Sequence, residues 1–85
     1  MPARVVMYRT RMCAYCVAAK LLLERRKIGY EEVDVSRDPE ARRRLLESSG
    51  RRTVPQIFID DRPIGGFLDL YELDRRGLLS QMIGA

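Results

Sequence analysis

The spacing of hydrophobic residues in the first half of the chain predicts a strand, a helix and a second strand. Residues 4–8 contain an uninterrupted apolar run that is typical of a buried strand. Residues 14–27 have apolar residues at helical spacing and predict a helix closed by Gly29, since glycine often follows the last helical turn. The predicted buried face of this helix consists of Val17, Ala18, Leu21 and Leu22. Residues 30–35 alternate between apolar and polar positions, which indicates a strand with one buried face.

The second half of the chain predicts a helix, a hairpin and a final helix. Residues 38–39 are Asp-Pro, which favours a helix start, and this helix is expected to end near Gly50. Residues 56–59 and 62–64 predict two strands joined by a tight turn, and a last helix is expected from about residue 68. The predicted order is therefore β-α-β-α-β-β-α, with a parallel first pair of strands and a terminal hairpin.

Length and composition predict one globular domain that spans residues 1–85. Hydrophobic residues make up 46% and charged residues 33% of the chain, which is the balance of a soluble protein. The apolar runs are too short to cross a bilayer, and the first residues lack the apolar stretch of a secretory signal. We therefore expect a cytoplasmic protein without a membrane contact. Two cysteines are too few to stabilise a protein of this size through disulfide bonds, so a packed core must provide most of the stability.

The net charge of +4 comes mainly from arginine, which supplies 14 of the 16 basic residues. Arginine binds carboxylates and phosphates through its planar guanidinium group. An excess of basic over acidic residues can indicate nucleic-acid binding, but the arginines are scattered along the chain and only six aromatic residues could stack on bases. A solvated basic surface is favoured over nucleic-acid binding, and a small anionic ligand fits the charge equally well.

The two cysteines form a Cys13-Ala14-Tyr15-Cys16 motif between the first predicted strand and the first predicted helix. The unpaired amides and positive dipole at a helix N-terminus stabilise a thiolate at Cys13, and Arg9 and Arg11 add positive charge. Cys16 lies one turn further along the helix, where it can attack a mixed disulfide on Cys13. This arrangement predicts that Cys13 is the nucleophile and Cys16 the resolving thiol.

Three other uses of the cysteines compete with redox chemistry. A structural disulfide fits poorly across so short a loop in a chain without an export signal. A closed zinc site within one chain needs four ligands, and the sequence has two cysteines and no histidine, so we expect no such metal site. Two inert buried thiols remain an alternative, but the strand-then-helix context favours redox chemistry.

Three blocks of sequence follow one another in the chain: Val6-Met7-Tyr8 before the cysteine motif, then Thr53-Val54-Pro55-Gln56-Ile57-Phe58-Ile59, and then Ile64-Gly65-Gly66 followed by Asp69-Leu70 and Leu73. With these blocks the chain resembles the glutaredoxin family almost from end to end, and most closely its short bacterial dithiol members. The resemblance implies the α/β thioredoxin fold, a four-stranded mixed sheet flanked by helices. It also implies a monomeric, glutathione-dependent enzyme that reduces protein disulfides and protein–glutathione mixed disulfides.

The resemblance further implies a glutathione site around the cysteines. Pro55 is expected to be cis and to face Cys13, while the backbone of Val54 pairs with the cysteinyl part of glutathione. The amides before the last helix are expected to bind the γ-glutamyl carboxylate, with Asp69 near its amine and Arg42 near the glycyl carboxylate. The full predicted set is Arg9, Tyr15, Arg42, Thr53, Val54, Pro55, Gly66, Phe67, Leu68 and Asp69. Residues expected only to pack are Tyr8, Tyr30, Phe58 and Tyr71, and those expected to form solvated surface are Arg43, Arg44, Arg51 and Arg52.

Two positions depart from the family pattern. Ala14 stands where dithiol members usually have proline, and small residues there also occur in members that hold a [2Fe–2S] cluster between two protomers with glutathione. Leu68 stands where a polar residue is common, which leaves that ligand contact to the backbone. Two alternative hypotheses accompany the oxidoreductase. One is a cluster-binding homodimer that uses Cys13 and glutathione; the other is a thioredoxin-like electron donor recycled by a flavin reductase.

Overall fold

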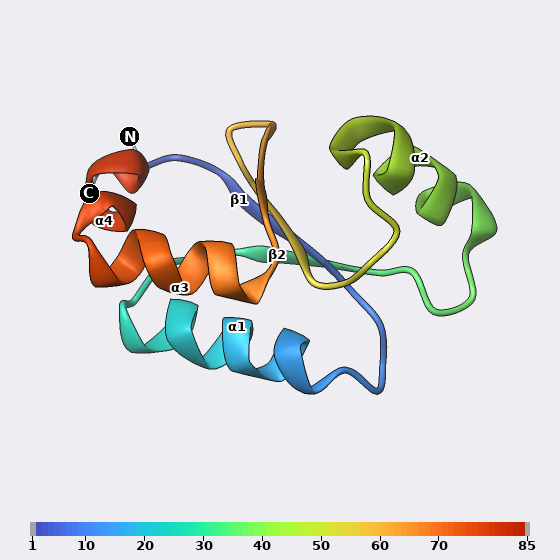
Figure 1. The fold of residues 1–85 in the computed structure, drawn as a ribbon, viewed down its shortest axis with the longest axis horizontal. Coiled ribbons are helices and arrows are strands. Elements are labelled where there is room, and N and C mark those ends of the chain that lie inside the picture. The colour runs from blue at the N-terminus through green and yellow to red at the C-terminus, as the bar shows by residue number, and fades with distance from the viewer. Residues whose placement is uncertain (1, 85) are drawn as a thin grey trace.

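The computed structural model describes residues 2–84 and contains one mixed four-stranded sheet (Figure 1). Its strands are β1 (Val5–Arg9), β2 (Glu31–Asp34), β3 (Gln56–Ile59) and β4 (Arg62–Gly65), in the order β2-β1-β3-β4. β1 is parallel to β2 and antiparallel to β3, and β3 is antiparallel to β4. The parallel first pair and the terminal hairpin are both as predicted.

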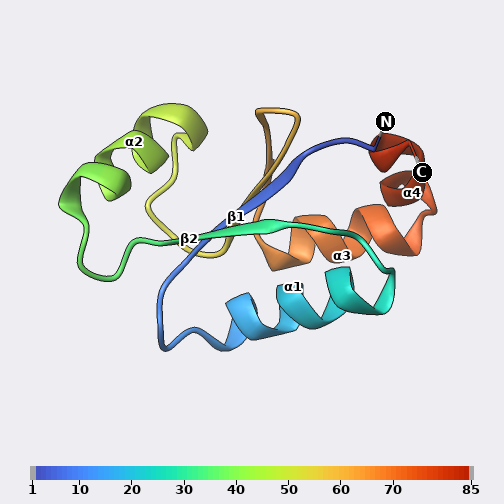
Figure 2. The same cartoon turned by 180° about the vertical axis from the view of Figure 1, so that it is seen from behind.

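Helices cover both faces of this sheet. α1 (Ala14–Arg25) and α3 (Phe67–Arg75) lie side by side on one face, and α2 (Pro39–Ser49) lies alone on the other (Figures 1 and 2). α4 (Leu78–Ile83) follows α3 and lies next to both chain ends. A four-stranded mixed sheet in this order with these flanking helices is the thioredoxin fold, which confirms the predicted fold class. Within residues 2–84, no helix has the length and apolar character needed to cross a membrane.

The main core lies between the sheet and the α1, α3 and α4 layer. Alternate residues of β1 point into it, so Val5 and Met7 are buried, and β3 contributes Ile57 and Ile59. The helices supply its other buried members, which are Ala19, Leu22, Leu23, Leu70, Leu79 and Ile83. This core fixes α1 and α3 against each other and thereby fixes the distance between their N-terminal ends.

The face of α1 that packs on the sheet differs from the predicted face. Of the predicted residues, Leu22 is buried as expected, whereas Val17 and Leu21 are 52% and 55% exposed. The other buried residues of this helix are Cys16, Ala19 and Leu23. Apolar residues point in several directions around α1, so their spacing alone does not select the packed face. The consequence for function is direct, because the packed face carries Cys16 into the core.

Two helix ends also differ from the predictions. α1 ends at Arg25, and the left-handed residue after it is Lys27 (φ 58°) rather than Gly29. The final helix is divided into α3 and α4 because Gly77 adopts a left-handed conformation (φ 73°) between them. The start of α2 is as predicted, since the side chain of Asp38 accepts a hydrogen bond from the amide of Ala41 (3.0 Å).

The end of β4 requires glycine at position 65. Gly65 has φ 119°, and a Cβ there would lie only 2.6 Å from Cγ of Asp69. We expect Gly65→Ala to lower the free energy of unfolding by about 2–3 kcal/mol, because it combines backbone strain with displacement of Asp69. The control is Gly50→Ala, where φ is 74° and the added methyl group meets no atom within 4 Å; its cost is about 1 kcal/mol of backbone strain. Urea unfolding measures both, and equal losses would contradict the close approach of Asp69.

Candidate active site

Cys13 occupies the N-cap position of α1, immediately before the first helical residue. Its sulfur accepts a hydrogen bond from the backbone amide of Cys16 (3.1 Å), and its thiol donates to the carbonyl oxygen of Val54 (3.7 Å). The amides of a first helical turn have no partner within the helix, so a sulfur in this position takes the place of a capping oxygen. A negative charge on Cys13 is therefore stabilised by the amide and by the helix dipole. The side chain is partly exposed, so a substrate can reach it.

Cys16 has the opposite environment. Its side chain is buried, with 2% of the residue exposed, because it belongs to the face of α1 that packs on the core. Burial is the main cause that raises the pKa of the Cys16 thiol to about 12, and a hydrogen bond with the Cys13 side chain contributes to the same increase. The backbone of Thr10 and the charge of Arg9 oppose this increase without cancelling it. Cys16 thus keeps its proton at neutral pH, while Cys13 is accessible to a substrate disulfide.

This difference predicts that the two thiols react separately with an alkylating agent. In the reduced native protein at pH 8, iodoacetamide should modify Cys13 first. The shift of the Cys16 pKa from 9.0 to about 12 lowers its thiolate population on the order of 1,000-fold. Mass spectrometry should find one adduct on the native protein and two after unfolding. In a Cys13→Ser control, the remaining thiol should stay protected; rapid labelling of Cys16 there would contradict its burial.

A groove of about 280 Å³ adjoins the cysteine motif, since it is lined by Tyr15 and by Val54, whose carbonyl oxygen accepts from Cys13. One wall is the loop before β3, in which the Val54–Pro55 peptide bond is cis. The other wall is the N-terminal end of α3, which approaches so closely that a Cβ on Gly66 would lie 3.4 Å from the carbonyl oxygen of Pro55. The lining residues are Tyr15, Arg51, Thr53, Val54, Pro55, Gln56, Gly66, Phe67, Leu68 and Asp69.

Asp69 organises the α3 side of the groove. Its carboxylate accepts a hydrogen bond from the amide of Gly66 (2.9 Å), as in a capping box, and lies 3.4 Å from the guanidinium group of Arg51. The amides of Phe67 and Leu68 belong to the first turn of α3 and have no acceptor within the helix. The groove therefore offers backbone donors for a carboxylate together with one cationic and one anionic side chain.

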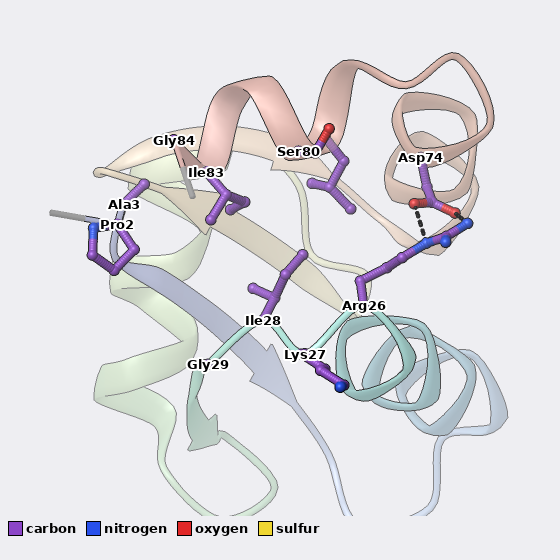
Figure 3. A pocket seen from close by; sticks show the side chains of 11 residues that line it. Pro2, Ala3, Arg26, Lys27, Ile28, Gly29, Asp74, Ser80, Ile83 and Gly84 are labelled. Atoms are coloured by element: carbon purple, nitrogen blue, oxygen red, sulfur yellow. Dashed lines mark hydrogen bonds and ion pairs between the residues drawn. The ribbon is translucent and has the colours of Figure 1, made fainter.

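A larger cavity than this groove lies elsewhere in the molecule. It has a volume of about 620 Å³ and lies at the C-terminal end of α1, whereas the cysteines lie at the N-terminal end (Figure 3). Arg26 and Asp74 form a bidentate ion pair at its edge (2.8 and 3.0 Å), and apolar side chains such as Ile28 and Ile83 form its floor. The smaller groove is the site of thiol chemistry, because Val54, which lines it, accepts a hydrogen bond from Cys13.

Comparison with known proteins decides the family. The glutaredoxin family model matches residues 5–64, which include both cysteines and the Val54–Pro55 loop. The chain belongs to the glutaredoxin family. It is 42% identical over 81 residues to glutaredoxin 3 of Escherichia coli K12, an alignment that covers 95% of this chain and 98% of that protein. Family membership makes it a thiol–disulfide oxidoreductase, which confirms the coarse function predicted from the cysteine motif.

Solved glutaredoxin structures agree with this assignment. The solution structure of the Brucella melitensis glutaredoxin has a TM-score of 0.85 and 41% identity, and the match covers 96% of this chain and 89% of that one. The crystal structure of a buckwheat glutaredoxin–glutathione complex has a TM-score of 0.88 and 28% identity, covering 96% of this chain and 77% of that one. In that relative, a glutaredoxin of this fold holds glutathione.

The structure brings together most of the site residues predicted from the glutaredoxin resemblance. Those that line the groove are Tyr15, Thr53, Val54, Pro55, Gly66, Phe67, Leu68 and Asp69. Tyr15 is 60% exposed beside the cysteines, as predicted, whereas Tyr71 is 48% exposed and is not the packing residue that the sequence suggested. Tyr8 and Phe58 do pack together, with ring centroids 5.4 Å apart.

Arg9 and Arg42 do not line this groove. The guanidinium group of Arg9 lies 3.6 Å from Glu32 and 3.9 Å from Asp34, both on the neighbouring strand β2. Arg42 donates a hydrogen bond to the carbonyl oxygen of Val35 (3.0 Å). It belongs to a separate hollow of about 320 Å³, whose lining residues are Thr10, Arg11, Met12, Ser36, Arg37 and Arg42. This hollow adjoins the residue before Cys13 and is strongly basic.

Sequence reasoning missed two groove residues. Arg51, predicted to be solvated surface, lines the groove and pairs with Asp69. The sequence did contain a signal for this role, because Arg51 lies only two residues before the predicted groove residue Thr53. Gln56 is 1% exposed; its amide nitrogen donates to the hydroxyl of Thr53 (3.2 Å), while its side-chain oxygen has no hydrogen-bond partner in the described structure. The glutamine thereby supports Thr53 from inside the protein.

Proposed function

We propose that this glutaredoxin uses glutathione to reduce protein disulfides and protein–glutathione mixed disulfides. The observation that carries the proposal is that Cys13 combines an N-cap sulfur, accepting the amide of Cys16, with a position beside a groove that contains backbone donors and Arg51. Glutathione is a peptide with two carboxylates and one amine, so it suits such a groove. The buckwheat complex supports this ligand through a relative of the same fold.

On a protein–glutathione mixed disulfide, the Cys13 thiolate attacks the glutathione sulfur. A sulfur–sulfur bond forms between Cys13 and glutathione, and the protein leaves as a thiolate that takes up a proton. A second glutathione, as its thiolate, then attacks the sulfur of the bound glutathione. Oxidised glutathione leaves, and Cys13 recovers its thiolate at the N-cap of α1. This route needs one cysteine.

On a protein disulfide, Cys13 instead forms a mixed disulfide with the substrate protein. Cys16 loses its proton and attacks the Cys13 sulfur, which releases the substrate thiol and leaves a Cys13–Cys16 disulfide. Two glutathione molecules then reduce this disulfide, which returns both thiols and yields oxidised glutathione. Burial and the hydrogen bond with Cys13 hold the pKa of the Cys16 thiol above its usual value, and the contribution of Cys13 is lost once its sulfur is in a disulfide. This route needs both cysteines.

A coupled assay tests glutathione dependence. The protein is given a glutathionylated peptide, glutathione, glutathione reductase and NADPH, and NADPH oxidation is followed. The control is the same peptide in a disulfide with cysteamine, which lacks the γ-glutamyl and glycyl groups. We expect kcat/KM for the glutathionylated peptide to be about tenfold higher, as one or two charge-assisted contacts would give.

A pair of arginine variants locates the preference in the groove. Arg51→Ala should reduce it several-fold, whereas Arg62→Ala, on the edge strand β4 and outside the groove, should leave it unchanged. Equal rates for the two disulfides would argue against a glutathione site. Turnover with thioredoxin reductase and none with glutathione would replace the proposal by the thioredoxin-like alternative. The cluster-binding hypothesis, the monomeric state and the cytoplasmic location stay predictions.

A further inference from the structure

Gln56 is a buried polar side chain that no step of the proposed mechanism uses. It is the first residue of β3, directly after the cis peptide bond, and 1% of it is exposed. Residues of a strand alternate between the two faces of a sheet, and Ile57 belongs to the main core. Gln56 therefore points to the opposite face, which α2 covers (Figures 1 and 2).

The amide of Gln56 is only half satisfied by hydrogen bonds. Its nitrogen, Nε2, donates to Oγ1 of Thr53 (3.2 Å), whereas its oxygen, Oε1, is buried and has no partner among the described residues. A buried oxygen without a hydrogen bond destabilises the folded state. The stability of the core therefore does not account for a glutamine at this position, and the bond from its nitrogen is the contact that remains to be explained.

This hydrogen bond determines what the Thr53 hydroxyl can do. A hydroxyl has one hydrogen and two lone pairs, and the Nε2 group of Gln56 can only donate. The bond occupies one lone pair of Oγ1 and leaves the hydrogen of the hydroxyl for another acceptor. Thr53 is exposed and lines the groove, so that acceptor is water in the free protein and an oxygen of the ligand when the groove is filled.

The same bond spans the loop that contacts Cys13. Thr53 and Gln56 lie on either side of the cis peptide bond, and within this loop the carbonyl oxygen of Val54 accepts from the Cys13 thiol (3.7 Å). Because Gln56 is paired within the sheet, its side chain ties the exposed end of the loop to a strand. The Thr53 hydroxyl is thus held in place relative to the thiol at which the ligand sulfur reacts.

We propose that Gln56 is a positioning residue that makes the Thr53 hydroxyl a hydrogen-bond donor to a carboxylate or carbonyl oxygen of the ligand in the groove. The inference rests on the proposed function, because glutathione supplies such oxygens, and it specifies how the groove recognises them. Cysteamine has neither a carboxylate nor a carbonyl group, so it gains nothing from this donor.

Gln56→Met tests the proposal, because methionine has nearly the same length and cannot donate a hydrogen bond. The readout is the ratio of kcat/KM for the glutathionylated peptide to kcat/KM for the cysteamine disulfide of the same peptide. We expect this ratio to fall about threefold, the effect of weakening one hydrogen bond to the ligand. The matched control is Gln81→Met, at an exposed glutamine of α4 that does not line the groove, and it should leave the ratio unchanged.

Thermal unfolding of the same variant separates positioning from a structural role. Gln56→Met removes the buried oxygen that lacks a partner, so its Tm should equal or exceed that of the wild-type protein while the ratio falls. A glutamine with a merely structural role gives the opposite pair of results. A lower Tm together with an unchanged ratio would therefore overturn the proposal.

Thr53→Val shows whether Gln56 acts through the hydroxyl. Valine has the shape of threonine without the hydroxyl, so this variant should lose as much of the ratio as Gln56→Met does. Combining the two substitutions should lower the ratio no further, because both remove the same donor. Additive losses would overturn the proposal. If Gln56→Met did not fold, an unchanged ratio in Thr53→Val alone would still overturn it.

The remaining outcomes distinguish this inference from the proposed function. An unchanged or higher ratio in folded Gln56→Met would mean that the hydroxyl donates to the glutamine instead of to the ligand, and it would overturn the inference alone. Equal rates for the two disulfides in the wild-type protein would overturn the glutathione site itself.

Discussion

Replacing Cys13 with serine is expected to reduce thiol transfer to the uncatalysed rate on every disulfide substrate. A serine hydroxyl can still accept the amide of Cys16, so the N-cap of α1 and the fold should survive. It is not ionised at neutral pH and does not form a disulfide, so the first step cannot occur. The coupled glutathione assay measures the loss, and circular dichroism verifies the fold. Residual turnover well above background would require another nucleophile.

Cys16→Ser is the matched comparison, because the two routes of the mechanism differ only in their need for this residue. The variant should keep most of its activity on glutathionylated peptides and lose reduction of protein disulfides, accumulating a mixed disulfide on Cys13 instead. Mass spectrometry under non-reducing conditions detects that intermediate. If Cys16→Ser lost deglutathionylation while Cys13→Ser kept it, the two roles would have to be exchanged.

The second large effect concerns stability and uses two leucines of the same helix. Leu23 of α1 is fully buried in the main core, whereas Leu21 is 55% exposed. Leu23→Ala should lower the free energy of unfolding by about 2–5 kcal/mol, since it removes buried apolar contacts and leaves a cavity. For a chain of this size that corresponds to a fall in Tm of at least about 10 °C.

The control, Leu21→Ala, should change the free energy of unfolding by less than about 0.5 kcal/mol, since an exposed leucine has little buried contact to lose. Thermal and urea unfolding of the two variants measure the contrast. Equal losses would mean that the predicted face of α1, with Leu21 inward, is the packed one after all, and that Cys16 is not in the core.

The local features of the fold could be predicted from the sequence because short-range chemistry determines them. Asp38 caps α2 through its own carboxylate, and the turn between β3 and β4 has two residues with positive φ, Asp60 and Asp61. The packed face of α1 depends on contacts with distant elements, and the apolar residues around this helix are compatible with more than one face. The division of the last helix at Gly77 likewise depends on how α4 packs against α3.

The reactive part of the site was predictable for the same reason. The position of Cys13 at a helix N-terminus follows from the order of strand, loop and helix, and the groove residues 53–55 and 66–69 come from the family pattern. The arginines were harder to place, because a long charged side chain is oriented by whichever acceptor the fold brings near it. Arg9 meets Glu32 and Asp34 across the parallel strand pair, whereas Arg51, in the loop between α2 and β3, meets Asp69 in the first turn of α3.

The helices on the two faces of the sheet are held by different amounts of buried surface, and this difference determines which helix unfolds locally. Of the residues of α2, only Ala41 and Leu45 are fully buried, whereas α1 is fixed by the main core. Backbone amides of α2 should therefore exchange with solvent deuterium through a local opening that leaves the rest folded, and those near Leu22 and Leu23 only through global unfolding. Arg42 belongs to α2 and takes part in that local opening, whereas the N-cap that holds Cys13 belongs to α1 and stays in place.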